Sequence, residues 1–395
     1  MKRTIVLALV AGFAALLAAT AVARPTAATR ADAQQAVSCK STLKIALVTP
    51  LTGGAGFIGN AQLRWAKYAI ATLPRTFGLK VQLVSGDTPV EQGPAPAQAL
   101  AQKYVADKSV VAIIGPATSG AVAATSKTYA DAGLAHISPS ATRTSLTQGS
   151  PREATSSFFR VVPGDYIQGP SDARFMIDKL NAKKVVIIDF QEPYSVGLAD
   201  AAQSVLKAKG VEVIRQSTSV KTTDFSSLVT KVPNDAQVVF FPTQQPEDAQ
   251  TFGQQLLEQG KRAKLFGGDG SNSPDKFKIA GSYVSNFAPD ISGIATSKAL
   301  VAGWKKANPG QSLESFGPPT YGAVQVALKA IQRACAVGKG QIKDRRDVVR
   351  NVKKGSIRNW ILGGTFRFST KSNDPLNAKF YIFQIQSNGT YKLVG

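Results

Sequence analysis

The stretch LKIALVTPLTGGAGFIGNAQLRWAKYAIATL, residues 43–73, decides the fold. Residues 43–49 are apolar and rich in strand-forming side chains, which predicts a buried β-strand. A glycine-rich loop follows at 50–59, and residues 60–73 repeat apolar side chains at helical spacing. A buried strand joined by a short loop to a helix is the unit from which parallel sheets with helices on both faces are built.

The same alternation of strand and helix continues on the C-terminal side and predicts two α/β lobes. The first lobe is expected to have strands at 43–49, 79–85, 110–114 and 134–138, with helices at 60–73, 95–105 and 120–132. The second lobe is expected to have strands at 184–189, 211–215, 237–241 and 263–267, with helices at 167–180, 197–209, 225–232 and 248–259. Further helices at 297–307, 320–337 and 344–352 and β-rich segments at 364–368 and 379–386 suggest that the lobes exchange chain more than once.

Composition excludes several classes of protein. The chain has 395 residues, 44% hydrophobic and 18% charged, which is the balance of a folded protein with two or three domains. With a single histidine and two cysteines, the sequence is short of residues for zinc sites, Cys-x-x-Cys redox pairs and histidine-based triads. We therefore expect no catalytic site, no metal, no cofactor and no enzymatic activity.

The N-terminus predicts export. A cationic start, Met1–Arg3, precedes an apolar run at 4–19 and the small-x-small sequence Ala21-Val22-Ala23. These are the three parts of a secretory signal peptide, so we expect cleavage near Ala23, a flexible tether at 24–42, and a protein in the periplasm or on the outer face of the membrane.

The formal net charge of +22 could indicate nucleic acid, anionic lipid or an anionic wall polymer as a neighbour. Export argues against nucleic acid, and the densest basic cluster, 343–358, has no interleaved aromatic side chains for base stacking. The cluster fits a solvated helix face best, and if it binds anything we expect lipid or wall polymer.

The two cysteines, Cys39 and Cys335, could form a disulfide in an oxidising compartment that would tie down the N-terminus. Two buried thiols are the alternative, and the sequence leaves the choice open.

Ligands of open parallel sheets bind where strands end and helices begin, so the loops after the strands are the candidate site. Ser119 follows the strand at 110–114, and Thr142 follows the strand at 134–138. Their hydroxyl groups, with helix N–H groups, suit a small carboxylate. Helix capping is the alternative role of such residues.

In the second lobe, two side chains that follow strands complement this anion site. Asp269 lies between glycines after the strand at 263–267, where its carboxylate could meet an ammonium group, and Tyr194 could cover a ligand with its ring. An Asx turn and a rim aromatic are the alternatives. Together the two lobes would make a receptor for a zwitterion.

Three other features suggest chemistry only weakly. Gly54–Gly59 matches G-x-G-x-x-G, but Asp87, the candidate ribose-binding acid, lies too far along the chain for a dinucleotide site. His136 lies within an apolar strand and is expected to be a core histidine. Glu153 and Asp165 have no context as paired carboxylates.

Several motifs, in this order, resemble the branched-chain amino acid (Leu/Ile/Val) binding proteins of ABC importers, and the similarity runs from about residue 43 to the C-terminus. The motifs are Lys44-Ile45-Ala46-Leu47 to Leu51-Thr52-Gly53, Ile114-Gly115-Pro116 to Ser119, Ile137-Ser138-Pro139-Ser140-Ala141-Thr142, Phe159-Arg160-Val161 to Gln168-Gly169, and Tyr194-Ser195-Val196-Gly197.

The resemblance implies two Rossmann-like lobes, each a parallel sheet flanked by helices, joined by a three-crossover hinge that closes on ligand. It places lobe 1 at 43–162 and 290–363 and lobe 2 at 163–289 and 364–395, with crossovers near 162–165, 288–294 and 364–368. The ligand-binding residues that it implies are Ser119 and Thr142 for a carboxylate, the Ser140 carbonyl and Asp269 for an ammonium group, Tyr194 as a cover, and Ala141 and Gln244 beside them.

The side-chain pocket departs from the family pattern. Gln244-Gln245 replace a frequent tyrosine pair, and Ile58 and Pro318 stand where aromatics are common. We therefore expect an amino acid or close analogue as ligand, with no assignment to Leu, Ile or Val. The alternatives are an amide, a urea-like compound or an aromatic acid in the same fold, and, from another class, a secreted polyanion- or cell-wall-binding protein. The expected partner is the membrane permease of an ABC importer, with no nucleic acid, and the protein is expected to be a monomer.

Overall fold

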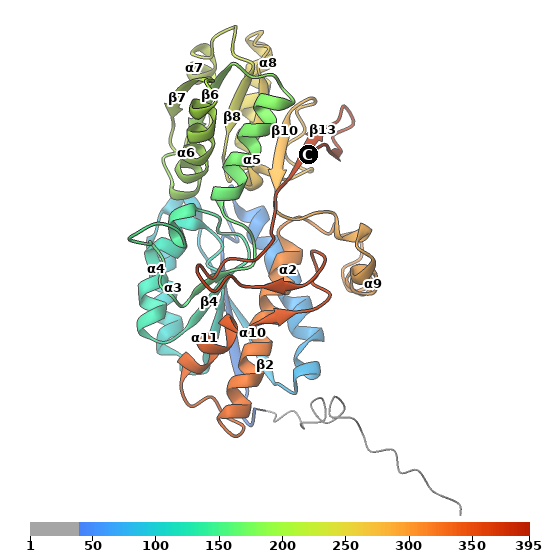
Figure 1. The fold of residues 1–395 in the computed structure, drawn as a ribbon. Helices are drawn as coiled ribbons and strands as arrows, with labels where there is room; N and C mark the ends of the chain where they lie inside the picture. Colours follow the sequence, from blue (N-terminus) through green and yellow to red (C-terminus); the bar gives the residue numbers. More distant parts are fainter. Residues whose placement is uncertain (1–38) are drawn as a thin grey trace, which may run out of the picture. The chain divides into compact units, whose positions relative to one another are not determined.

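The computed structural model describes residues 39–395, and the expected signal peptide lies outside the described residues. The described chain forms two α/β lobes, each a sheet flanked by helices (Figure 1), as the sequence predicts. In Figure 1 the first sheet lies among α2, α3, α4, α10 and α11, and the second among α5, α6, α7 and α8.

The sheet of lobe 1 has the order β2-β1-β3-β4-β5, and all of its strand pairs are parallel. Its strands are β1 (Leu43–Thr49), β2 (Val81–Asp87), β3 (Val110–Ile114), β4 (Ala135–Ser138) and β5 (Phe158–Arg160). Its helices are α2 (Gly56–Thr72), α3 (Ala95–Ala106), α4 (Ser119–Asp131), α9 (Lys298–Ala307), α10 (Gly317–Val337) and α11 (Arg345–Lys353). Both faces of the central strands are covered, which is why β3 and β4 are buried throughout.

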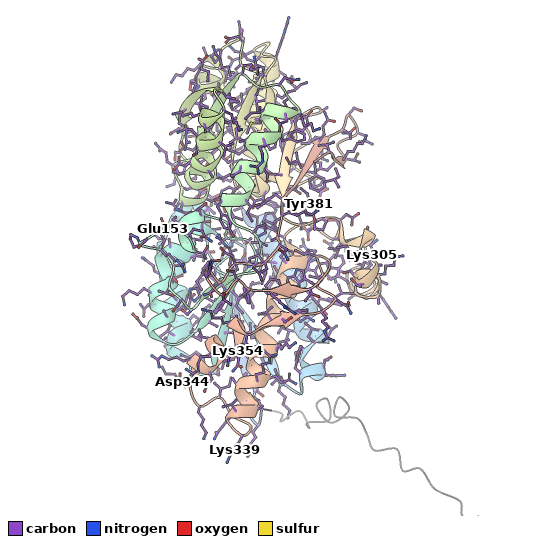
Figure 2. All side chains as sticks on the ribbon, in the orientation of Figure 1. Glu153, Lys305, Lys339, Asp344, Lys354 and Tyr381 are labelled. Atoms are coloured by element: carbon purple, nitrogen blue, oxygen red, sulfur yellow. A yellow bond between two sulfur atoms is a disulfide. The ribbon has the colours of Figure 1, made fainter. Side chains whose placement is uncertain are left out.

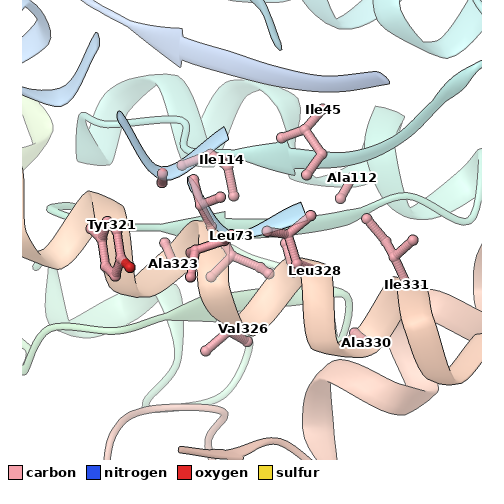
Figure 3. Close-up of a cluster of buried hydrophobic side chains, with 14 of the residues drawn as sticks. Ile45, Leu73, Ala112, Ile114, Tyr321, Ala323, Val326, Leu328, Ala330 and Ile331 are labelled. Carbon is pink, nitrogen blue, oxygen red and sulfur yellow. The ribbon is translucent and has the colours of Figure 1, made fainter. Parts of the chain in front are cut away.

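The two-residue period of β1 divides its side chains between two cores. Ile45 and Leu47 pack with α2, α10 and α11 on one face, whereas Ala46 and Val48 pack with α3 and α4 on the other. Figure 3 shows Leu328 and Ile331 of α10 beside the first of these faces. Each such aliphatic side chain contributes about 1.5–3 kcal/mol when fully buried, so α10 is a principal stabilising element of the lobe.

The sheet of lobe 2 has the order β14-β13-β10-β9-β8-β6-β7. Its strands are β6 (Lys184–Asp189), β7 (Glu212–Ser217), β8 (Val238–Phe241), β9 (Lys264–Gly267), β10 (Tyr283–Asn286), β13 (Tyr381–Ile385) and β14 (Tyr391–Leu393), and its helices are α5 (Asp165–Asp178), α6 (Pro193–Ala208), α7 (Ser226–Thr230) and α8 (Pro246–Glu258). β13 and β14 add antiparallel strands to an otherwise parallel sheet. The sequence did not predict β10, whose short stretch Tyr-Val-Ser-Asn has a weak strand pattern.

The chain passes between the lobes after β5, after β10 and before β13. The third passage follows residue 374, later than the segment at 364–368 expected from the sequence, because β12 (Phe366–Arg367) pairs with β11 (Ser356–Ile357) in lobe 1. The ring of Phe366 stacks on that of Trp360 with centroids 4.3 Å apart. Aromatic burial therefore keeps this segment in lobe 1, although its β-rich composition resembles that of a strand of the second sheet.

The described chain begins on lobe 1. Cys39 and Cys335 form a disulfide that joins the residues before β1 to the end of α10, which settles the alternative that the sequence left open. The backbone N–H of Lys40 also donates to the carbonyl oxygen of Gly340 at 2.8 Å. None of the helices between residues 39 and 395 is both long and apolar enough to span a bilayer.

Removing this disulfide should destabilise the folded chain. In the Cys39→Ser, Cys335→Ser double variant we expect the free energy of unfolding to fall by about 2–5 kcal/mol, because the cross-link restricts the unfolded chain. Chemical denaturation with and without a reductant measures the effect. The unmodified protein should lose the same stability on reduction, and the double variant should not respond; equal stability of the two oxidised proteins would contradict the prediction.

Candidate functional site

The first half of the candidate site is the N-terminus of α4. Thr118 caps this helix, since its Oγ1 accepts a hydrogen bond from the N–H of Ala121. The N–H groups of Ser119 and Gly120 donate to no partner among residues 39–395. Unpaired N–H groups at the positive end of a helix dipole form a site for an anion such as a carboxylate.

The loop after β4 supplies further polar atoms. The Ser140 hydroxyl is engaged within lobe 1, since it donates to the carbonyl of Ala117 at 2.7 Å and accepts from Gln62 Nε2 at 2.9 Å. The carbonyl oxygen of Ser140, in contrast, accepts no hydrogen bond from the part of the chain that the structure describes. Thr142 Oγ1 is buried and likewise has no partner there. These two atoms are available to a ligand.

One buried guanidinium fixes the shape of this loop. Arg160, at the end of β5, is fully buried and donates from Nη1 to the carbonyls of Thr142 at 2.7 Å and Arg143 at 3.0 Å, with a longer contact to that of Ala141. Its Nε donates to the Asp374 carboxylate at 2.6 Å. Burial alone would raise the pKa of Asp374, but the charge and hydrogen bonds of Arg160 hold it below the usual value.

The second half of the site is a tyrosine–aspartate pair in lobe 2. The hydroxyl of Tyr194, in the first turn of α6, donates to Asp269 Oδ1 at 2.9 Å and accepts from the N–H of Gly270 at 3.0 Å. A Cβ at Gly270 would lie 2.6 Å from the carbonyl oxygen of Thr243, so the chain needs glycine beside the pair. Burial raises the pKa of Asp269 to about 6.

Asp165 is a carboxylate that the sequence analysis set aside for lack of context. It begins α5, its N–H donates to the Thr142 carbonyl at 2.8 Å, and its side chain is fully buried. Neither of its carboxylate oxygens has a hydrogen-bond partner among the described residues. Burial, followed by the nearby negative charge of Asp269, raises the pKa of Asp165 to about 8. Glu153, the other acid considered from the sequence, instead forms an ion pair with Arg143 at 3.0 Å.

Glu192 and Gln244 lie near the start of α6, the helix that carries Tyr194. The Glu192 carboxylate accepts from the N–H groups of Tyr194 at 2.8 Å and Ser195 at 2.7 Å, which fixes the start of α6. Burial raises the pKa of Glu192 to about 7. The side chain of Gln244 is buried near the Glu192 carboxyl group, and its Nε2 makes no hydrogen bond of ordinary geometry within residues 39–395. An unpaired buried N–H donor can select a ligand that carries an acceptor.

The two halves face each other across a contact between the lobes. Arg143 follows Thr142 in lobe 1, and its Nη1 donates to the carbonyl of Pro193 at 2.6 Å. Pro193 directly precedes Tyr194 in lobe 2. The N–H of Arg143 also donates to Ser119 Oγ at 3.2 Å. The structure therefore brings Ser119 and Thr142 together in lobe 1 and Tyr194 and Asp269 together in lobe 2, with Asp165 between the two sets.

The glycine-rich loop after β1 is held by acidic side chains of its own lobe. Asp87 accepts from the N–H of Leu51 at 2.6 Å and from that of Thr52, and Glu91 accepts from the N–H of Gly54 at 2.7 Å. The loop thus uses these carboxylates for its own structure. His136 has the core role expected from the sequence: it is buried, and its Nε2 lies 2.8 Å from Ser126 Oγ.

A cavity of about 540 Å³ is lined by residues of both lobes, but by none of the candidate ligand-binding residues described above. Its walls include Phe57, Phe316 and Pro318 from lobe 1 and Asn272, which follows Asp269 by three residues, from lobe 2. The rings of Phe57 and Phe316 meet edge to face with centroids 5.6 Å apart. The first turn of α2 therefore supplies an aromatic wall through Phe57, next to Ile58, where the sequence has no aromatic.

A sheet-and-helix pair of lobes with polar loops meeting between them is the architecture of a two-lobed solute receptor. The chain matches the periplasmic binding protein family over residues 42–390 and belongs to it. It is 30% identical over 303 residues to an amino acid binding protein of Pseudomonas aeruginosa, a match that covers 74% of this chain and 79% of the relative.

Two further similarities agree with this membership. The chain is 28% identical over 322 residues to the Leu/Ile/Val-binding protein BraC3 of Rhizobium johnstonii, covering 79% of this chain and 84% of the relative. A crystal structure of a leucine binding protein, LivK, from Thermotoga maritima superposes with a TM-score of 0.78 at 23% identity, over 89% of this chain and 98% of that one. The predicted fold and the resemblance to Leu/Ile/Val-binding proteins are thus confirmed.

The raised pKa of Asp165 makes a prediction for stability. A carboxyl with a folded pKa of about 8 and an unfolded pKa near 4 binds more protons in the folded chain, so its stabilising contribution is lost as the pH rises between these values. We expect Asp165→Asn to become more stable relative to the unmodified protein by about 1.4 kcal/mol per pH unit from pH 5 to pH 7.

Denaturant unfolding of both proteins across this range measures the difference. Comparing the two proteins cancels the titration of groups that do not interact with Asp165, such as His136, whose pKa burial lowers to about 4. A difference in stability that stays constant with pH would show that Asp165 is ionised in the folded chain.

Proposed function

We propose that the chain is the extracytoplasmic solute-binding protein of an ABC importer and binds an amino acid or a close analogue between its two lobes. The observation that carries the proposal is the opposition of unpaired hydrogen-bond donors and buried carboxyl groups. Free N–H groups at the start of α4 and the Thr142 hydroxyl lie on one side, and the buried carboxylates of Asp165 and Asp269 lie on the other.

The α-carboxylate of the ligand would bind in lobe 1. It would accept hydrogen bonds from the N–H groups at the start of α4, from Ser119 Oγ and from Thr142 Oγ1, with the helix dipole supplying positive potential. The α-ammonium group would donate to the carbonyl of Ser140 and to the carboxylate of Asp269. Asp165 would be a further acceptor, and Tyr194 would hold Asp269 in place through its hydroxyl.

Binding would change the protonation of the site. Without a ligand, burial disfavours the charged forms of Asp165 and Asp269, and their pKa values lie at about 8 and about 6. An ammonium group placed against them favours the ionised forms, so the pKa values fall and protons are released on binding. The contact would be desolvated by closure of the lobes, which makes a charged partner essential.

The ligand's side chain would extend toward the cavity beside Phe57, Phe316 and Pro318. The aromatic wall favours an apolar group, whereas the unpaired Nε2 of Gln244 favours an acceptor on the ligand. The Gln244 amide is the observation that supports a second candidate, a receptor of the same fold for an amide, a urea-like compound or an aromatic acid. In either case the partner would be a membrane permease, and the protein would act as a monomer.

Thermal unfolding against a panel of amino acids, amides and aromatic acids tests the proposal. With the ligand at about a thousandfold above its dissociation constant, linkage predicts about 4 kcal/mol of stabilisation and a rise of several degrees in Tm. A rise with amino acids alone supports the first candidate. A rise with amides or aromatic acids and none with zwitterions would replace it by the second, and no rise with any compound would reject both.

Asp269 should dominate recognition of the ammonium group. In Asp269→Asn we expect amino-acid binding to weaken by about 2–5 kcal/mol, since one partner of a buried charge pair is lost. In the unmodified protein, affinity should rise as the pH rises through about 6, where Asp269 ionises, and the variant should lose this step but keep the rise toward pH 8 that Asp165 contributes.

Titration calorimetry at pH 5 and pH 8 measures both effects. Asp235→Asn is the matched control, because Asp235 is an exposed acid of lobe 2 that pairs with Lys184 and should leave binding unchanged. Unchanged affinity in a folded Asp269→Asn variant would exclude Asp269 from the site.

A further inference from the structure

The positive charge of the chain is concentrated in one lobe. Lobe 1, taken as residues 39–162 and 291–375, has 27 Lys and Arg against 9 Asp and Glu. Lobe 2, residues 163–290 and 376–395, has 16 against 15. Binding of a small solute between the lobes does not require this asymmetry, so the surplus on lobe 1 points to a separate contact.

Part of the surplus lies at the amino edge of the lobe 1 sheet, where the parallel strands begin. Lys40 precedes β1, Lys80 precedes β2 and Lys108 precedes β3, and the turn between α10 and α11 adds Lys339 and Lys343. All five side chains are exposed. Figure 2 shows Lys339 at the end of lobe 1 that lies away from lobe 2. We call this surface the basic face; its members are Lys40, Arg75, Lys80, Lys108, Lys339, Lys343 and Arg346.

Backbone contacts hold these segments side by side. The N–H of Lys40 donates to the Gly340 carbonyl at 2.8 Å, and the N–H of Leu43 donates to the Lys80 carbonyl at 2.9 Å. A groove of about 830 Å³ runs between the first two strand starts and is lined by Lys40, Arg75 and Lys80. The cations therefore form one surface and not separate charges on unrelated loops.

The acids around the basic face neutralise only part of it. Asp107 pairs with Lys44 at 2.9 Å and Asp131 with Lys127 at 2.8 Å, both lysines outside the face. Asp344 lies 3.7 Å from Arg346 and offsets that one cation. The remaining cations of the face, including Lys339 and Lys343, make no ion pair within residues 39–395. Several unpaired positive charges on one face attract a surface that carries several negative charges.

An exposed apolar side chain distinguishes between polyanions. Val337, the last residue of α10, is 73% exposed, more than any other large apolar side chain in the described chain, and it precedes Lys339 by two residues. A fully polar polymer gains nothing from such a side chain. A bilayer surface offers both anionic headgroups for the cations and an acyl boundary for Val337.

We propose that the basic face is a docking surface for an anionic phospholipid bilayer, through which the receptor rests on the membrane. Because ligands bind at the carboxyl ends of the strands, the face lies at the opposite edge of the lobe 1 sheet from the candidate site. Docking therefore leaves the ligand site open. It would keep the receptor close to its membrane partner through contacts that are individually weak and exchange readily.

Vesicle sedimentation tests the proposal with the chain from residue 24, the mature form expected from the sequence. Vesicles of phosphatidylcholine alone are compared with vesicles that also contain phosphatidylglycerol. We expect binding to the anionic vesicles only, and its loss when the salt concentration rises from about 0.05 M to about 0.5 M. In a triple variant that combines Lys80→Glu, Lys339→Glu and Lys343→Glu, binding to anionic vesicles should fall by at least about a hundredfold.

A second triple variant controls for net charge. Lys179→Glu, Lys207→Glu, Lys209→Glu changes the charge equally, on exposed lysines of lobe 2, and should bind vesicles nearly as well as the unmodified protein. Thermal unfolding with and without the solute ligand should match in all three proteins, which separates docking from folding and from the proposed receptor function. If the two triple variants lose vesicle binding equally, net charge alone explains the effect, and the assignment of the basic face as the docking surface is overturned.

Val337→Ser separates a bilayer from a soluble polymer. Loss of the apolar contact should weaken binding to anionic vesicles by about threefold to tenfold, with no change in the thermal stability of the protein. Binding of soluble polyphosphate that is as strong as vesicle binding and insensitive to Val337→Ser would overturn the membrane proposal in favour of a wall polymer. Equal binding to neutral and anionic vesicles would overturn it as well.

Discussion

The buried ion pair between Arg160 and Asp374 is the contact on which the candidate site depends. Arg160 ends β5, and Asp374 lies just before the third passage between the lobes, so the pair joins two places where the chain leaves lobe 1. The same guanidinium holds the carbonyls of Thr142 and Arg143. Losing one partner of such a pair leaves an uncompensated buried charge, which typically costs about 3–5 kcal/mol. Hinge and ligand loop are therefore constrained by a single side chain.

The candidate ligand site has the opposite character, because its buried carboxyl groups form no ion pair within the described residues. Asp165 and Asp269 are buried near each other, and Thr142 and Gln244 keep polar atoms without partners. Each such group costs free energy in the empty protein. A ligand that completes their hydrogen bonds recovers this cost, so specificity follows from the same groups that destabilise the empty state. The hydrogen bonds of Arg160 hold the loop after β4 in the shape that keeps these polar atoms unpaired. Without them the loop would relax and bury fewer unpaired atoms.

The sequence predicted the lobes and most strands because these depend on local periodicity. Leu43–Thr49 was predicted with the bounds that the structure has. Tyr283–Asn286 was missed because its serine and asparagine weaken the apolar strand pattern, and its place inside the sheet depends on the strands on either side of it. Ser119, Tyr194 and Asp269 were named as ligand candidates because they follow strands. Asp165 was not, since an acid in the first turn of a helix is common and its burial arises from residues distant in sequence.

The polarity of a parallel sheet accounts for the division of charge within lobe 1. All strands of the sheet run the same way, so the carboxyl edge collects helix N-termini and therefore binds anionic groups, while the amino edge collects the loops that enter the strands. The carboxyl edge meets lobe 2 and must keep the balance of charges that the solute requires. The amino edge is under no such constraint, because a Debye length of about 8 Å at physiological salt screens its exposed lysines from a distant cleft. A strongly basic surface can therefore coexist with a receptor for a small solute, provided that the two occupy opposite edges of one sheet.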